Sequence, residues 1–412
     1  MAKLPLEGVR VADFTWVWAG PYCTLQLAHL GADVIRIETR TRPCVTRLLP
    51  PWPDAKPGIN RSGYFNQYNQ GKRSLTLNYA KPGALEIAKR LVAASDIVTN
   101  NFAAGVMDKL GLGYEELRKI KPDIIMISLS GYGDTGPYHK YVAYGPAQVP
   151  LSGLSSLTGY KGWPPMQAGF SYADPNAGVH GAFALLVALY HRRRTGEGQY
   201  IDMSQWECAM GLLPEAIMDY TMNGHQPPRD GNRDALIAPH GVFPSKDRFE
   251  NSGTMIDMWV SIVAADDDDF ERLARAMGNP DLAREPRFAT AAARKQNEDE
   301  LETIISAWTS ERSAAEAERI LQAAGVAAAV CAPNKVVAED DHLKERNYWV
   351  YLEHPEVGVQ QHCGMPWRMS RTGGGVRAPA PLIGQHTDEV LTKVLGYGAD
   401  EVARLREAGA LE

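Results

Sequence analysis

The sequence predicts an α/β protein built around a parallel sheet, and two observations support that prediction. In the first third of the chain, short runs rich in Val and Ile alternate with stretches of helical periodicity. This alternation is the pattern of strands joined by crossover helices. The runs are also nearly continuous in apolar residues, as in strands that helices cover on both faces. We therefore expect the sheet to be built from the first 130 residues.

The expected elements of this part follow in order along the chain. The strands are expected at residues 9–15, 33–38, 74–78, 96–102 and 123–130, and helices at 21–30 and 82–94. Ligands of open α/β sheets bind outside the carboxyl ends of the strands. Residues that follow these runs are therefore candidates for a binding site.

A segment rich in Gly, Pro and Tyr follows at 131–173. Glycine and proline at this density predict loops, and ordered long loops often carry function. Two long helical patterns come next, at 175–193 and 203–222. The composition then changes at 223–233, NGHQPPRDGNR, which is typical of a linker.

Beyond the linker, the pattern predicts a strand at 258–264 and a helix at 266–277. This helix begins with acidic residues, which suits the helix dipole. An Ala- and Glu-rich stretch at 298–324 is also helical in its spacing. We therefore expect a large domain, 1–224 together with 331–412, and a smaller α/β domain, 225–330.

Composition and charge exclude several classes of protein. The formal charge of −6 at pH 7 argues against nucleic acid as a partner, because phosphate-binding faces are usually basic. The five cysteines are far apart and show no CxxC spacing, so we expect no disulfide framework, no metal site and a cytoplasmic location. We see no signal peptide. The longest apolar run, 177–190, is too short to span a membrane, and we expect it to form a buried helix.

The first expected strand leads through Gly20 and Pro21 into a helix. Backbone N–H groups at such a helix start can bind anions, although an ordinary strand–helix turn has the same pattern. Neither GxGxxG nor GxxxxGK[ST] occurs there, so a dinucleotide or ATP site of those kinds is not indicated.

Cations and an aromatic ring adjoin the next strands. Lys72 and Arg73 stand beside the third expected strand, and Asn101, Phe102 and Lys109 follow the fourth. A flat ring with cations suits a nucleotide that carries phosphates. The alternative is a solvated charged rim.

Asp174 is the carboxylate of greatest interest, because it stands directly before Pro175 and an apolar helix. An Asp in this place is usually an N-cap. The functional alternative is a nucleophile or base at the mouth of a loop-lined cleft. His180, one turn further on, is expected to be buried and satisfied, and His240 lies in a loop. No GxSxG or HExxH motif occurs.

Taken together, these segments resemble the family III CoA-transferases, which include formyl-CoA transferase and carnitine CoA-transferase and are related to α-methylacyl-CoA racemase. Six motifs occur in the order of that family and cover nearly the whole chain. They lie at 11–38, 69–78, 100–113, 127–138, 174–204 and 380–391.

The resemblance implies a Rossmann-like parallel sheet, a smaller α/β domain and an interlocked dimer, either a homodimer or a heterodimer with a paralogous subunit. It implies that Asp174 is the catalytic nucleophile. In this family the aspartate attacks an acyl-CoA thioester to form a mixed anhydride. The CoA thiolate then forms an aspartyl-CoA thioester, which the acceptor acid attacks. The substrates are CoA thioesters and free carboxylic acids, and no permanently bound cofactor is expected.

The resemblance also implies two sets of binding residues. Those expected to bind CoA are Arg40, Lys72, Arg73, Leu77, Asn101, Phe102 and Lys109. Those expected to bind the acyl group or the acid are Trp16, Trp18, Tyr144, His240 and Gly241.

Some residues depart from the pattern of the family. Trp18 stands where formyl-CoA transferase has Gln, so oxalate and formate are not expected as substrates. Tyr144 stands where the racemases have His, and a tyrosine is a poor base at neutral pH. This favours a transferase, and a racemase or epimerase is the alternative interpretation. A third possibility is one subunit of a hetero-oligomeric CoA-transferase. We expect a donor such as succinyl-CoA, from the habit of the family, and a mid-sized acid acceptor that is aromatic or a substituted dicarboxylate.

Overall fold

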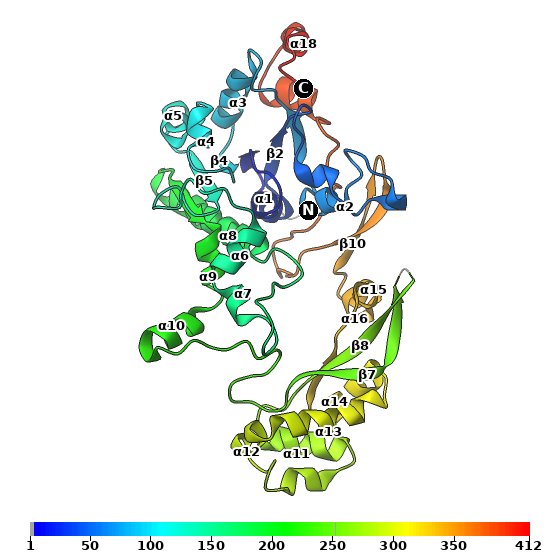
Figure 1. Cartoon of the computed structure of the whole chain (residues 1–412). Coiled ribbons are helices and arrows are strands. Elements are labelled where there is room, and N and C mark those ends of the chain that lie inside the picture. The colour runs from blue at the N-terminus through cyan, green and yellow to red at the C-terminus, as the bar shows by residue number, and fades with distance from the viewer. Residues whose placement is uncertain (1–3, 252) are drawn as a thin grey trace. The chain divides into compact units, whose positions relative to one another are not determined.

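The structure is a computed structural model that describes residues 4–251 and 253–412 (Figure 1). The described chain forms two compact units. The first contains the described residues up to Ser156 together with Gln167–Pro227 and Glu345–Glu412, and the second contains Leu157–Met166 with the described part of Pro228–Lys344. The second unit thus includes 157–166 and 331–344, which the sequence analysis placed in the large domain. Backbone hydrogen bonds account for both additions: the Gly231 amide donates to the Gly159 carbonyl, and the Cys331 amide donates to the Trp259 carbonyl.

The first unit is built on a parallel sheet, as predicted. Within the described residues the sheet has six strands in the order β3-β2-β1-β4-β5-β6. The strands are β1 (Arg10–Asp13), β2 (Asp33–Glu38), β3 (Arg73–Thr76), β4 (Ile97–Asn100), β5 (Ile125–Ser130) and β6 (Tyr200–Ser204). This is the strand order of a doubly wound fold, in which the order of the parallel strands reverses between β1 and β4.

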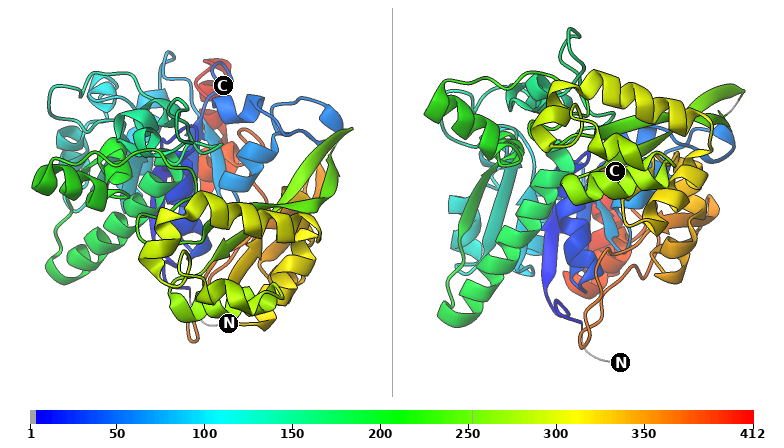
Figure 2. Two further views of the ribbon diagram at one scale, coloured as in Figure 1. Left: turned by 60° about the horizontal axis from the view of Figure 1, so that its bottom comes forward. Right: turned by 90° about the horizontal axis from the view of Figure 1, so that it is seen from below.

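Helices cover both faces of this sheet, so neighbouring residues of one strand enter different cores. Val11 of β1 belongs to the core under α1 (Ala19–His29) and α8 (Ala173–Thr195). Ala12 belongs to the opposite core, with α3 (Ala84–Ala93) and α5 (Tyr114–Ile120). In Figure 2, α8 is the long green helix beside the blue α1. The near-continuous apolar strands are therefore explained by burial on both sides.

The second unit has an antiparallel sheet in the order β7-β8-β9. Its strands are β7 (His240–Asn251), β8 (Thr254–Val263) and β9 (Ala327–Val330), and its longer helices are α11 (Asp267–Ala276), α13 (Glu298–Ser310) and α14 (Ala314–Ala323). Phe270, Ile305 and Leu321 of the three helices pack with Val260 and Ile262 of β8. Asp266 caps α11 by accepting a hydrogen bond from the Asp269 amide, so the acidic start expected from the sequence is the true helix start.

The remaining elements are short. They are η1 (Val45–Leu48), η2 (Pro53–Ala55), α2 (Gly63–Tyr68), α4 (Val106–Lys109), α6 (Gly145–Leu151), α7 (Leu154–Leu157), α9 (Gln205–Met210), α10 (Pro214–Asn223), η3 (Pro280–Arg284), α12 (Ala291–Gln296), α15 (Asn334–Glu339), α16 (Asp341–Glu345), the hairpin β10 (Trp349–His354) with β11 (Gly358–Cys363), α17 (Thr387–Glu389), η4 (Val390–Val394) and α18 (Ala399–Glu407).

Two expectations about helices were wrong. The helix expected at 203–222 is a strand end followed by two helices, because α9 ends before Gly211 and α10 begins at Pro214. The helix expected to be buried at 177–190 is buried on one side only. Its other side exposes Val179, Phe183, Val187 and Tyr190, and His180 is exposed as well. Across residues 4–251 and 253–412, no helix combines the length and the apolar character that crossing a bilayer requires.

Candidate active site

The strand order reverses between the parallel strands β1 and β4, and the segments that follow these two strands are held together. The Asn101 side chain, just after β4, accepts a hydrogen bond from the Trp16 amide and donates one to the Trp16 carbonyl, both at 2.7 Å. The Trp16 and Phe102 rings meet edge to face, with centroids 6.2 Å apart. In open α/β sheets this is the crevice where ligands bind. The structure therefore brings together three residues that the sequence assigned to binding.

The loop between β1 and α1 contains a strained residue. Val17 has a φ of 64°, in the left-handed region that a β-branched residue rarely adopts. Its amide contacts the sulfur of buried Cys44 at 3.2 Å, which anchors the loop. Such strain persists only where surrounding structure enforces it, and it clusters at functional sites. Two residues later, Ala19 opens α1.

Asp174 lies in the first turn of α8, and its carboxyl group is buried. Tyr172 occupies the N-cap position, so of the two interpretations of Asp174 the N-cap does not hold. The carboxyl group accepts hydrogen bonds from the Ser171 hydroxyl and from the Ala19 amide. Burial raises the pKa of Asp174, and these two hydrogen bonds oppose that shift only in part.

An aromatic wall stands beside Asp174. The Trp18 ring lies 5.7 Å from Tyr64, 5.3 Å from Tyr68 and 6.3 Å from Phe170, between centroids. Burial raises the pKa of Tyr64, and the nearby Asp174 carboxylate raises it further. Tyr64 therefore lies close both to the Trp18 ring and to the Asp174 carboxyl group.

Sequence reasoning missed Tyr64 and Tyr68, which come from the six-residue helix α2. Their spacing of four residues, which puts both rings on one helix face, was the available signal. It also missed Arg42, whose guanidinium lies 5.7 Å from the Trp16 ring.

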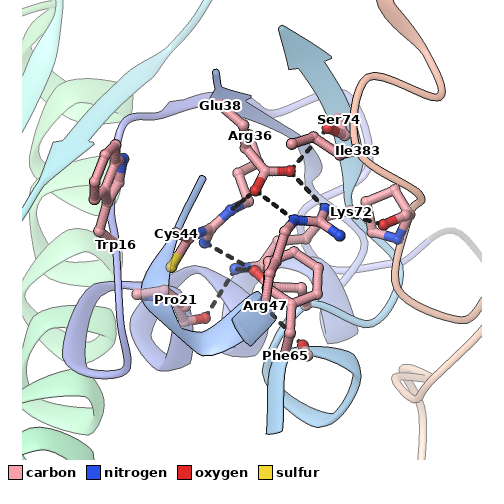
Figure 3. A network of polar contacts seen from close by, with 12 residues as sticks. Trp16, Pro21, Arg36, Glu38, Cys44, Arg47, Phe65, Lys72, Ser74 and Ile383 are labelled. Carbon is pink, nitrogen blue, oxygen red and sulfur yellow. Dashed lines mark hydrogen bonds and ion pairs between the residues drawn. The ribbon is translucent and has the colours of Figure 1, made fainter. Parts of the chain in front are cut away.

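Figure 3 shows how α2 is attached to the sheet by buried charges. Arg47 donates to both oxygens of Glu38, at 2.8 and 2.7 Å, and its guanidinium lies 3.5 Å from the ring centre of Phe65 in α2. Arg36 is ion-paired with the same carboxylate, and Ser74 donates to it. Burial alone would raise the pKa of Glu38, but Arg47, Arg36 and Ser74 together outweigh burial and hold that pKa at about 2. The network fixes the helix that carries Tyr64 and Tyr68.

The residues predicted to bind CoA are divided by the structure. Arg40, Leu77, Asn101 and Phe102 follow the carboxyl ends of their strands, β2, β3 and β4, and Lys109 ends the short helix α4. Arg40 and Lys109 are exposed, whereas Leu77 is fully buried in the core. The Arg40 guanidinium donates to the Ile383 carbonyl at 2.8 Å. These residues therefore share the carboxyl edge of the sheet.

Lys72 and Arg73 are not part of that surface. The Lys72 ammonium is buried and donates to Asp13, Thr24, Asn69 and the Pro21 carbonyl, while burial lowers its pKa to about 8. Arg73 begins β3, at the amino edge of the sheet, where its guanidinium pairs with Asp33 and Glu389. Both cations are occupied inside the protein, so the expectation that they contact CoA phosphates does not fit their positions.

The residues predicted to bind substrate belong to two different units. Trp16 and Trp18 lie in the loop after β1, and Tyr144 is exposed at the N-cap of α6. His240 and Gly241 belong to the second unit, where they begin β7 opposite Val263 and Ile262. Gly241 lines a cavity of about 380 Å³ in that unit. No group of three or more His, Cys, Asp or Glu side chains suited to a metal ion occurs in the part of the chain that the structure describes.

Gly145, directly after Tyr144, lies against the Asp174 carboxyl group. A Cβ atom on this glycine would stand 1.9 Å from Oδ2 of Asp174. The arrangement as a whole is a buried carboxyl group with two hydrogen-bond donors, a glycine wall and an aromatic wall. A carboxylate in such a setting can act as a nucleophile toward an activated acyl group.

Comparison with known proteins agrees with this chemistry. Residues 6–387 match the family model described as CoA-transferase family III. A succinyl-CoA–D-citramalate CoA-transferase of Chloroflexus aurantiacus is 34% identical over 98% of this chain and 97% of its own length. A succinyl-CoA:mesaconate CoA-transferase of Haloarcula marismortui is 34% identical over 94% of this chain and 95% of its own.

The fold has solved counterparts as well. The crystal structure of a CAIB/BAIF family protein from Brucella suis superimposes with a TM-score of 0.85 at 30% sequence identity, covering 95% of this chain and all of that one. One conclusion follows from the alternation of strands and helices, from the site where the strand order reverses, and from the family match over nearly the whole chain. The chain belongs to the family III CoA-transferases and is an enzyme of that family.

Proposed function

We propose that this enzyme moves CoA from succinyl-CoA to a mid-sized carboxylic acid, with Asp174 as the covalent nucleophile. The observation that carries the proposal is the Asp174 carboxyl group, which is buried beside the N-terminus of α1 and lined by aromatic rings. Relatives that are named for succinyl-CoA as donor support the choice of donor.

The reaction proceeds by acyl exchange and balances without a further reagent. The Asp174 carboxylate attacks the thioester carbonyl, a mixed anhydride forms and the CoA thiolate leaves. The thiolate attacks the aspartyl carbonyl carbon, which gives aspartyl-CoA and releases succinate. The acceptor carboxylate then attacks aspartyl-CoA, and the freed thiolate attacks the acceptor half of the new anhydride. Product acyl-CoA leaves and the Asp174 carboxylate is restored. A thioester replaces a thioester, so the scheme needs no nucleoside triphosphate and no resident cofactor.

The environment of Asp174 suits the first of these steps. Burial raises the pKa of this carboxyl group, which means that its ionised form is poorly stabilised by solvent. A carboxylate of that kind is a stronger base and a better nucleophile than one in water. The two hydrogen bonds from Ser171 and Ala19 hold it in one orientation.

We place the CoA moiety along the carboxyl edge of the sheet. Arg40, Lys109 and the newly found Arg42 are exposed cations there, suited to phosphates. Phe102 and Asn101 flank the crevice between β4 and β1. Because Lys72 and Arg73 are engaged elsewhere, they have no part in this proposal.

The acceptor is proposed from the walls of the site. Trp16, Trp18 and the tyrosines of α2 offer flat apolar surfaces, and Tyr144 adds an exposed ring. Such surfaces favour an acid with a substantial carbon skeleton over oxalate or formate. A substituted dicarboxylate fits this requirement and the names of the relatives, and an aromatic acid fits the walls equally well.

We also propose that the chain works as a dimer, interlocked as the resemblance to the family implies, with a second copy or with a paralogous subunit. The exposed apolar side of α8, with Phe183 67% exposed, supports an interface. Helix α10 also presents Met218, Tyr220 and Met222 to solvent and buries none of its residues.

A matrix of acyl-CoA donors and free acids, followed by mass spectrometry of the acyl-CoA products, tests the function. We expect turnover with succinyl-CoA and mid-sized acids and none with oxalate or formate. Exchange of an α-proton in deuterated water, without any transfer of CoA, would instead indicate a racemase and would overturn the proposal.

A further inference from the structure

Two hydrogen-bond donors converge on the Asp174 carboxyl group from different elements. The Ser171 hydroxyl, in the segment before α8, donates to Oδ2. The Ala19 amide, at the first residue of α1, donates to the same group. Since α1 has eleven residues, its amino end also carries partial positive charge. Two features that stabilise negative charge on oxygen therefore adjoin the carboxyl group, although burial still raises its pKa.

The backbone of Gly145 covers the hydrogen bond between Ser171 and Asp174. A Cβ atom at residue 145 would lie 1.9 Å from Oδ2 of Asp174 and 1.7 Å from Oγ of Ser171. Gly145 does not adopt a positive φ, so space rather than backbone conformation requires glycine. The hydrogen bond is thus partly buried, and a donor aimed at a developing charge is more effective there than in water.

We propose that Ser171 is a second catalytic residue, whose hydroxyl stabilises the negative charge that develops on Oδ2 of Asp174 whenever its carbonyl carbon is attacked. The inference rests on the proposed function, because it requires Asp174 to pass through covalent intermediates. Ser171 holds Oδ2, and so Oδ1 is the oxygen that attacks the donor thioester.

The chemical step balances with Ser171 as a hydrogen-bond donor only. The CoA thiolate sulfur forms a bond to Cγ of Asp174, and the carbonyl π electrons move to Oδ2. The hydrogen bond from Ser171 strengthens as this charge grows. The bond between Cγ and Oδ1 then breaks, and the donor carboxylate leaves with its electron pair. The same sequence recurs when the acceptor carboxylate attacks and the CoA thiolate leaves, and no proton changes place.

Ser171→Ala tests the proposal. We expect kcat to fall by about 10²-fold, the usual cost of losing one donor of this kind, while KM for succinyl-CoA changes little. Ser171→Thr keeps the hydroxyl and should restore most of the turnover. Ser130→Ala is the matched control, since the buried Ser130 hydroxyl has no hydrogen-bond partner among the described residues, and it should turn over like wild type.

The pH profile gives a readout that a merely structural role would not move. The hydrogen bond from Ser171 lowers the pKa of Asp174 against the effect of burial, so its loss should shift the acid limb of kcat/KM to higher pH. Among the described residues, Tyr64 of α2 is a titratable side chain close to Asp174. Burial and that carboxylate raise the pKa of Tyr64, so it does not ionise in the acid range. The Thr variant should return the limb to its wild-type position.

The outcomes separate this inference from the proposed function. If hydroxylamine trapping labels Asp174 in the wild type and Ser171→Ala keeps wild-type kcat and an unshifted acid limb, the role of Ser171 is refuted and that of Asp174 stands. If wild-type Asp174 is never labelled during turnover, the proposed function itself fails. Should the Ala variant not fold, Ser171→Cys retains a similar side chain with a much weaker donor and should lose turnover in the same way.

Discussion

Two buried carboxyl groups of the first unit, Glu38 and Asp174, have opposite electrostatic surroundings. Glu38 sits between Arg47 and Arg36 and accepts a further bond from Ser74, and its pKa falls to about 2. The described contacts of Asp174 are neutral donors, and its pKa rises. Burial is similar, 3% against 9% exposed, so the partners decide the difference. A carboxylate neutralised by cations stabilises the fold, whereas one left without them is prepared to react.

Replacing Asp174 by Asn should have the largest effect on turnover of all the substitutions at these two carboxyl groups. Turnover should fall by at least about 10⁴-fold, since a nucleophile is lost. The fold should be as stable as before or more so, because a poorly solvated buried charge has been removed. Steady-state kinetics and thermal melts of the same preparation check both parts. A variant that keeps substantial activity would place the nucleophile elsewhere.

Gly145→Ala should disturb the same carboxyl group without changing its chemistry. The added methyl group overlaps Oδ2 of Asp174 and Oγ of Ser171, so one of them must move. A displacement of about 1 Å at a reacting group costs about 10²-fold in rate. Kinetics at saturating substrate measure this loss. Unchanged kcat would show that the pocket relaxes freely around residue 145. Gly398→Ala, at a glycine of the first unit with open space and a φ of −73°, controls for the substitution itself.

Glu38→Gln should lower the free energy of unfolding much more than it lowers turnover. It leaves Arg47 and Arg36 buried without their anionic partner. Breaking a buried ion pair of this kind costs about 3–5 kcal/mol. Urea unfolding monitored by circular dichroism measures it. If the folded fraction retained normal stability, the network would not be what holds α2 against the sheet.

Replacement of edge cations should have smaller effects that fall on binding. Lys109→Ala and Arg40→Ala should each raise KM for the CoA thioester several-fold with little change in kcat, and the difference should shrink as salt rises. Arg73→Ala is the matched control, because its guanidinium is paired at the amino edge of the sheet. A rise in KM for Arg73→Ala alone would contradict the proposed course of CoA.

The smallest expected effect is the pH dependence of stability. The folded state raises the pKa of Asp174 above its ordinary value of 3.8, so its contribution to stability is lost as pH rises through the folded pKa. Asp174→Asn should therefore melt above wild type at pH 7, and this margin should vanish as pH falls below about 3.8. The stability that Glu38 contributes has the opposite pH dependence. It is present above pH 4.5 and is lost as pH falls toward about 2. Thermal melts of wild type and Asp174→Asn across this pH range measure the difference in melting temperature. A difference that grows on acidification would contradict a raised pKa for Asp174.

The sheet could be predicted from the sequence because its evidence is local. Alternating apolar runs located β1 to β5, and the run at 33–38 coincides with β2. The edge strand β6 was missed, because its residues alternate between exposed and half-buried and begin beside a glycine-rich turn. The start of strand β7 was missed as well, since His240 was placed in a loop.

The site was less accessible because it is made by contacts between distant segments. Asp174 could be found from its motif, and Ser171 stands only three residues before it, but Gly145 and Ala19 meet Asp174 only in the folded chain. Lys72 looked like a surface cation, and only the structure shows its ammonium bound to Asp13. Local pattern reports burial and periodicity, whereas ion pairing between elements leaves no local trace.

The most direct test of Asp174 as the nucleophile is trapping of the aspartyl intermediate. Wild-type enzyme is incubated with succinyl-CoA in the absence of acceptor, treated with hydroxylamine and digested for peptide mass spectrometry. We expect a hydroxamate on Asp174, none on Glu38 and none on either residue in Asp174→Asn. An unlabelled Asp174 in enzyme that still transfers CoA would contradict the assignment of this carboxyl group as the nucleophile.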